Sequence, residues 1–301
     1  MRKGRCSPNR GARTDFAEHD ERDARTPRNS MREGDRCSFA RGRKPSIDMR
    51  GCTLPHMVRR SVRDTQRVVR DLLRSARWTW HRWNGAEVVH LLHIGKTGGT
   101  ALGQLLRSQV STRHLVVPHG HRTRLEDVPR GDKVVFFVRD PVDRFVSGFW
   151  SRYREGKPRY HVPWTTGEHS AFGVFETPDQ LGRALGADDE QIRNHAEVAM
   201  RTIEHVRDSY WYWFRDPHYF RSRVPDFLLV GFTETFDEDV TKLRQILELS
   251  PSAALPTDDT AAHRRPPTQD PTLSPHAVAN LQRWYARDYE FIELCREIRG
   301  A

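Results

Sequence analysis

The stretch Val88–Leu106 constrains the fold of this chain more than any other part of it. Its first half, Val88–Ile94, is an apolar run typical of a buried strand. The run breaks at Gly95-Lys96-Thr97-Gly98-Gly99-Thr100 and continues with leucines at the spacing of a helix face, Leu102, Leu105 and Leu106. A strand, a glycine-rich loop and a helix in this order can bind an anion, because loop N–H groups, the helix dipole and a lysine present positive charge together.

Apolar strands and helices alternate along the rest of the chain. Strands are predicted at Leu115–Val117, Lys133–Val138 and Asp226–Phe232, and helices at Val142–Tyr153, Asp188–Val206, Thr235–Leu249 and from the Ser274-Pro275 cap to Ile298. Residues 155–187 are predicted to be an irregular structured segment, and the aromatic stretch Ser209–Phe220 to be core. This alternation predicts an α/β protein: a P-loop-like three-layer fold with a central parallel sheet flanked by helices.

Charge divides the chain into a tail and a body. Residues 1–80 hold 21 Lys and Arg against 10 Asp and Glu, whereas residues 81–301 hold 29 against 30. We predict a disordered basic tail over 1–56 and one domain over 57–301, with an insertion over the site at 155–225. Residues 57–80 are predicted to form an amphipathic helix that either packs on the domain or makes a peripheral membrane contact. The nearly neutral body predicts no specific nucleic-acid partner.

The cysteines show no spacing typical of a metal or redox site; they are Cys6, Cys37, Cys52 and Cys295. We therefore expect a reduced, cytoplasmic protein, with membrane association through 57–80 as the alternative. No apolar stretch approaches the ~18–20 residues of a membrane span.

A second anion-binding pattern begins where the predicted strand Lys133–Val138 ends. Arg139-Asp140-Pro141 follows it, and Pro141 suits the first turn of a helix. Ligands of open parallel sheets lie at the carboxyl ends of the strands, so Arg139 is expected at the same edge as Lys96. Ser147 stands about two helical turns later, where its hydroxyl and the forked Arg139 guanidinium can bind one phosphate.

HIGKTGGTAL, followed about forty residues later by RDPVDRFVSGF, resembles the two cofactor signatures of sulfotransferases that use 3′-phosphoadenosine 5′-phosphosulfate. The resemblance implies that Arg139 and Ser147 bind the 3′-phosphate. It implies that the 5′-phosphosulfate is bound by the residues of the first signature: Lys96, Thr97, Gly98, Gly99, Thr100 and Ala101. Arg264 and Arg265 stand in a late loop that often closes over the nucleotide in this family, although a solvated basic turn is the alternative.

PHGHRTRLEDVP is similar to the His-Gly-His stretch of heparan sulfate 2-O-sulfotransferases, in which the second histidine is the general base. This similarity implies His121 as the base, with His119 in support, in a bacterial member of the superfamily. The implied reaction is in-line transfer of a sulfuryl group to an acceptor hydroxyl, by expectation on a carbohydrate, with no metal. His119 itself, or an acid such as Glu126 or Asp127, is the alternative base, and His90 and His93 are expected to be structural.

Two other functions are compatible with the sequence. Gly95-Lys96-Thr97 also matches the end of the nucleotide phosphate loop, which would predict a Mg²⁺-dependent small-molecule kinase, but His90 replaces the first glycine of that motif. A non-catalytic protein that binds a nucleotide, RNA or a membrane is the other alternative. Four aromatic residues could stack on a sugar or belong to the core: Trp150, Tyr153, Tyr160 and Trp164.

Overall fold

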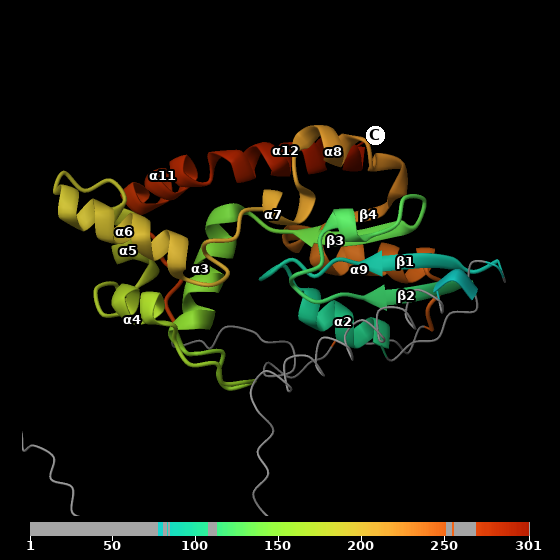
Figure 1. The fold of residues 1–301 in the computed structure, drawn as a ribbon, viewed down its shortest axis with the longest axis horizontal. Helices are drawn as coiled ribbons and strands as arrows, with labels where there is room; N and C mark the ends of the chain where they lie inside the picture. The colour runs from blue at the N-terminus through green and yellow to red at the C-terminus, as the bar shows by residue number, and fades with distance from the viewer. Residues whose placement is uncertain are drawn as a thin grey trace, which may run out of the picture. The chain divides into compact units, whose positions relative to one another are not determined.

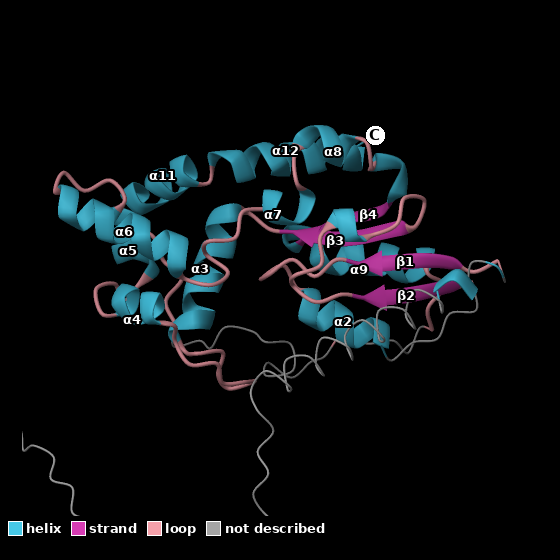
Figure 2. Cartoon of the chain, in the orientation of Figure 1, coloured by secondary structure: helices cyan, strands magenta, loops and turns pink. Residues whose placement is uncertain are grey.

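A single parallel sheet forms the centre of the protein in the computed structural model, which describes residues 78–80, 83, 85–107, 113–250, 255 and 269–300. The strands are β1 (Glu87–Leu91), β2 (His114–Pro118), β3 (Lys133–Val138) and β4 (Phe227–Phe232). They pair in the order β2-β1-β3-β4, and all three pairings are parallel (Figures 1 and 2). The predicted α/β class with a parallel sheet and flanking helices is confirmed.

Helices cover both faces of the sheet because the side chains of β3 are apolar on both sides. Val134 and Phe136 pack in one cluster with α7 (Trp211–Phe214), α8 (Pro217–Arg221) and α12 (Ala286–Gly300). Val135 and Phe137 pack in the opposite cluster with α2 (Gly99–Arg107) and α9 (Phe236–Ile246). This alternation is the period of two that a strand imposes on its side chains.

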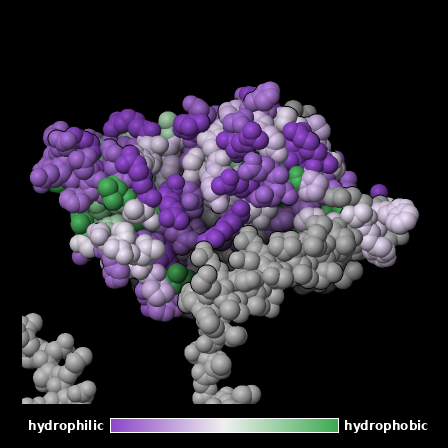
Figure 3. Space-filling model, viewed as in Figure 1, coloured by the Kyte–Doolittle hydropathy of each residue, from purple (hydrophilic) through white to green (hydrophobic). Residues whose placement is uncertain are grey.

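A second, helical core lies beyond the carboxyl end of β3. It joins α3 (Pro141–Tyr153), α4 (Thr166–Phe172), α5 (Pro178–Ala184), α6 (Glu190–Thr202) and α11 (Pro275–Trp284) (Figure 1). Short 3₁₀ turns occur at Leu125–Asp127, Val224–Asp226 and Thr233–Thr235. In the view of Figure 3, hydrophobic surface gathers mainly at the end that carries α4–α6. Among the described residues of this region, Val174, Ile192 and Val198 are large apolar side chains that are exposed.

Three predicted elements need correction. Residues 155–187 are not irregular throughout, since α4 and α5 begin there at capping boxes led by Thr165 and Thr177. The helix expected over Asp188–Val206 spans only Glu190–Thr202. The single final helix is two helices, because α11 ends at Trp284 and α12 starts at Ala286. Ser274 does cap α11, accepting a hydrogen bond from Ala277 N.

Some predictions fall outside the described residues. The tail over 1–56 and most of the helix over 57–80 are among them, and only Trp78, Thr79 and Trp80 of that helix are described, all three helical. Within the described part of the chain, no helix has both the length and the apolar character needed to cross a membrane.

A matched pair of isoleucines tests the packing of α12 on the sheet. Ile292 is 2 % exposed in the core beside β3 and β4, whereas Ile192 is 46 % exposed on α6. We expect Ile292→Ala to lower the free energy of unfolding by about 2–5 kcal/mol. Ile192→Ala should change it by no more than about 0.5 kcal/mol. Urea denaturation measures both, and equal losses would contradict this packing.

Candidate active site

The carboxyl ends of all four strands open into one pocket of about 610 Å³. Lys96 follows β1, His121 follows β2, Arg139 follows β3 and Glu234 follows β4. This is the edge at which parallel α/β sheets bind their ligands, and the volume is in the usual range of ligand pockets. The other lining residues are His93, Gly98, Gly99, Thr100, Ala101, Asp143, Ser147, Tyr160, His205, Thr233, Phe236, Asp237 and Leu255.

The loop after β1 needs glycine at two close approaches. Gly98 has a φ of +83°, and a Cβ atom there would lie 2.6 Å from the Phe236 ring. A Cβ atom on Gly99 would lie 2.1 Å from the His93 ring. The Phe236 and His93 rings therefore leave no room for a side chain at either glycine. Both glycines line the pocket at the N-terminus of α2, where backbone N–H groups lack helical partners.

Lys96 is held in the same loop with a φ of +70°, a left-handed conformation that is uncommon for lysine. Burial, together with the nearby charges of Arg154 and Arg139, lowers the pKa of its ammonium to about 7. Lys96 is thus buried within the electrostatic influence of two arginines, of which Arg139 also lines the pocket. A bound anion would stabilise these charges and would also restore the charge of Lys96.

Arg139 is fixed through its backbone by a fully buried tyrosine. The Tyr210 hydroxyl accepts a hydrogen bond from Arg139 N at 2.9 Å and donates to Arg139 O at 2.6 Å. Asp140 then caps α3, accepting from Val142 N and Asp143 N. Ser147 faces the same pocket from α3, so the structure brings the predicted pair of Arg139 and Ser147 together with Lys96.

Of the candidate bases, His121 is the one that lines the pocket. Its Nδ1 lies 3.2 Å from His93 O, and its carbonyl accepts a hydrogen bond from Trp213 Nε1 at 2.7 Å. Because a carbonyl only accepts, Nδ1 carries the hydrogen and Nε2 of the neutral ring is left with its lone pair. Burial lowers the pKa of His121, although the bond to His93 opposes this shift.

His119 lies in a different network and does not line the pocket. Its Nε2 is 2.8 Å from His90 Nδ1, and His90 Nε2 is 2.9 Å from the Asp132 carboxylate. His90 is fully buried, as its expected structural role requires. Glu126 and Asp127 lie on the 3₁₀ turn after β2 and hydrogen-bond to Arg124, away from the pocket lining.

Other expected site residues divide between the pocket and the interior. Thr97 is buried, and its hydroxyl donates to Ile94 O at 3.1 Å, so it shapes the loop from inside. His93 was expected to be structural but lines the pocket, with its ring centroid 3.9 Å from that of His121. Of the four candidate sugar-stacking residues, Tyr160 alone lines the pocket; Trp150, Tyr153 and Trp164 belong to the helical core. Arg264 and Arg265 lie outside the described residues.

Sequence reasoning missed two residues that build the pocket. Arg144 is buried on α3, and its guanidinium donates to Gly95 O at 3.1 Å and to Asp208 O at 2.5 Å. It therefore ties the loop after β1 to the segment after α6. That segment carries His205, which is 8 % exposed and lines the pocket. Arg144 stands inside RDPVDRFVSGF, five residues after Arg139, so the second motif could have indicated it, whereas His205 lies in neither motif.

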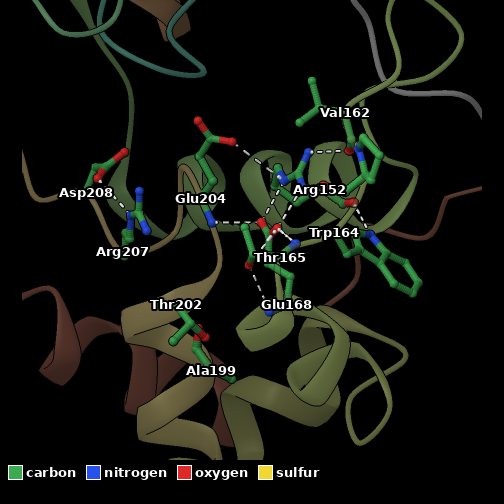
Figure 4. A network of polar contacts seen from close by, with 11 residues as sticks. Arg152, Val162, Trp164, Thr165, Glu168, Ala199, Thr202, Glu204, Arg207 and Asp208 are labelled. Carbon is green, nitrogen blue, oxygen red and sulfur yellow. Dashed lines mark hydrogen bonds and ion pairs between the residues drawn. The ribbon is translucent and has the colours of Figure 1, made fainter. Parts of the chain in front are cut away.

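A buried ion pair between Arg152 and Glu168 is connected to Glu204 (Figure 4). Arg152 and Glu168 bond through Nε–Oε1 at 2.6 Å and Nη2–Oε2 at 2.7 Å, and both are almost fully buried. Glu168 also accepts from the backbone N–H of Glu204, the residue before His205. Burial raises the pKa of Glu168, but hydrogen bonds from Arg152 and from the Thr165 and Glu204 backbone outweigh it and lower the pKa to about 2.

Compared with known proteins, the chain matches no protein-family model and no curated protein. Within the described part of the chain, no three His, Cys, Asp or Glu side chains are grouped so that they could hold a metal ion.

The ion pair predicts a pH-dependent contribution to stability. The Glu168 pKa is lower in the folded protein than in the unfolded chain. Its contribution is therefore complete above about pH 4.5 and is lost as the pH falls toward 2. We expect Glu168→Gln to lower the free energy of unfolding by about 3–5 kcal/mol near pH 6. The difference from the wild type should shrink as the pH falls to 3.

Glu197→Gln is the matched control, because Glu197 pairs with Arg201 on the exposed surface of α6. Chemical denaturation across this pH range should show a change of at most about 1 kcal/mol for the control. A Glu168→Gln difference that stays constant from pH 6 to pH 3 would contradict this account.

Proposed function

We propose that the chain is a sulfotransferase that moves a sulfuryl group from 3′-phosphoadenosine 5′-phosphosulfate to an acceptor hydroxyl, with a carbohydrate as the expected acceptor. One observation carries the proposal: the Lys96 loop and the Arg139–Ser147 pair line the same pocket, together with His121. A nucleotide with an anionic group at each end needs two such anion sites within its own length.

In this proposal, the P-loop-like turn binds the 5′ end of the nucleotide. Backbone N–H groups at Gly98, Gly99 and Thr100 donate to the 5′-phosphate at the N-terminus of α2. Lys96 adds a full charge beside the bridging oxygen of the phosphosulfate. Arg139 and Ser147 bind the 3′-phosphate. Glu234 and Asp237 also line the pocket, and their carboxylates suit the hydrogen-bond donors of the nucleoside rather than its phosphates.

The transfer step needs one base and one stabiliser of the leaving group. A bond forms between the acceptor oxygen and sulfur while the bond between sulfur and the bridging phosphate oxygen breaks. His121 Nε2 takes the acceptor proton, and adenosine 3′,5′-bisphosphate leaves with the electron pair of the broken bond. The low pKa of His121 keeps its ring neutral and ready to accept a proton at pH 7. Lys96 stabilises the charge that builds on the leaving oxygen.

Binding of adenosine 3′,5′-bisphosphate without added metal is the first test. Calorimetry should detect it for the wild type, and Arg139→Ala should weaken it about 10–100-fold because a charged hydrogen-bond donor to phosphate is lost. Arg221→Ala is the control, since Arg221 is an exposed arginine of α8 that pairs with Glu297. Thermal stability that responds to ATP with Mg²⁺, and not to millimolar bisphosphate, would refute the proposal in favour of a kinase.

The low pKa of Lys96 predicts a pH dependence of this affinity. Above about pH 7 the lysine is neutral in the free protein and takes up a proton when the anion binds. The affinity should therefore fall as the pH rises from 7 to 9, by up to about tenfold per pH unit. Lys96→Arg should abolish this dependence, because arginine keeps its charge over the whole range. The same slope in both proteins would contradict the assignment of the proton to Lys96.

A further inference from the structure

His205 occupies a place between the two cofactor motifs that only glycines allow. A Cβ atom on Gly95, in the first motif, would lie 2.8 Å from His205 Nδ1. A Cβ atom on Gly148, in the second motif, would lie 3.2 Å from His205 Cβ. The ring also makes an edge contact with the His121 ring, at 5.5 Å between centroids. The imidazole thus reaches the pocket at the point where the loop and the candidate base meet.

The backbone of His205 has a φ of +68°, which costs a histidine conformational energy unless its surroundings impose it. Three contacts do so. The N–H of Glu204 is bound by the Glu168 carboxylate, the carbonyl of Val206 accepts from the Tyr285 hydroxyl at 2.8 Å, and that of Asp208 accepts from Arg144. The fold therefore holds His205 at the pocket although its residue type disfavours a positive φ.

Neither ring nitrogen of His205 hydrogen-bonds to any residue that the structure describes, although the side chain is more than nine-tenths buried. The small exposed part of the side chain is consistent with its place in the pocket lining. Nδ1 faces the Gly95 backbone, so the opposite edge of the ring, which carries Nε2, is the part left for a ligand. A hydrogen-bond partner for this edge would therefore lie in the pocket.

The charges around His205 keep its ring neutral. Burial lowers its pKa well below the usual value, and the positive or protonatable groups Lys96, His121, Arg144 and Arg152 lower it further. A neutral imidazole carries one N–H and donates from it. Because sulfuryl oxygens only accept hydrogen bonds, the ring would present its N–H toward them.

We propose that His205 is a further catalytic residue, whose Nε2–H donates a hydrogen bond to an oxygen of the sulfuryl group during transfer. The inference rests on the proposed function, since it names the group that fills the space between the loop and His121. The proposed hydrogen bond can form with the donor nucleotide, which carries the sulfuryl group. It cannot form with the bisphosphate product, which lacks that group.

A matched pair of variants tests the role. His205→Gln keeps an amide N–H near the position of Nε2, whereas His205→Met has a similar length without a donor, and both carry the same backbone strain. In binding measurements without acceptor, His205→Met should weaken the donor nucleotide about 3–10-fold and change the bisphosphate affinity by less than about twofold. His205→Gln should recover most of the donor affinity.

The outcomes distinguish the two proposals. A wild type that binds neither nucleotide refutes the proposed function. If the wild type binds both, equal losses for donor and bisphosphate, no loss in His205→Met, or no recovery in His205→Gln each overturn the role of His205. Should the variants fail to fold by circular dichroism, ¹⁵N resonances of the wild-type imidazoles decide: a His205 shift with the donor and none with the bisphosphate supports the role, and equal shifts overturn it.

Discussion

The pocket depends on one buried guanidinium. Arg144 donates to the carbonyl of Gly95 in the loop after β1 and to the carbonyl of Asp208 beyond α6, from a helix that starts at the end of β3. Its guanidinium also lies 4.7 Å from the centre of the Tyr210 ring, and Tyr210 in turn fixes the backbone of Arg139. Arg144 thus connects the sheet, the helical core and both predicted anion-binding motifs.

The side chains that line the pocket are positioned by the parallel sheet and by buried contacts. Parallel strands bring their carboxyl ends to one edge, so residues from four distant parts of the chain need little further adjustment to meet there. The Phe236 and His93 rings pack closely against Gly98 and Gly99 at the start of α2, and Glu168, paired with Arg152, holds the segment after α6. Burial and the charges of Arg154 and Arg139 disfavour the charged form of Lys96, whereas a bound anion would favour it.

Much of the fold was predictable from local patterns. The strand Lys133–Val138 was predicted with its correct bounds because it is apolar on both faces and is followed shortly by a helix with Asp140 as its N-cap and Pro141 in its first turn. β1 ends earlier than its apolar run, since Leu92 and Ile94 stay buried after leaving the sheet. The helices α4 and α5 were missed although each begins at a capping box, because seven residues give too little periodicity for recognition.

Some residues of the candidate site were also predictable from local sequence, and others were not. The Lys96 loop and the pair of Arg139 and Ser147 were predictable because each motif lies within a few residues of a strand end. His205 was not, because its place depends on two distant glycines and on an ion pair that form only in the folded chain. His119 and His121 look alike in sequence, yet the single residue between them sends one ring to Asp132 through His90 and the other to the pocket.

A crystal structure of the protein with adenosine 3′,5′-bisphosphate tests the central claim most directly. The account predicts the 5′-phosphate at the N–H groups of Gly98–Thr100 beside Lys96, and the 3′-phosphate within hydrogen-bond distance of Arg139 and Ser147. The nucleotide bound outside this pocket, or with one of its two phosphates free in solvent, would contradict it.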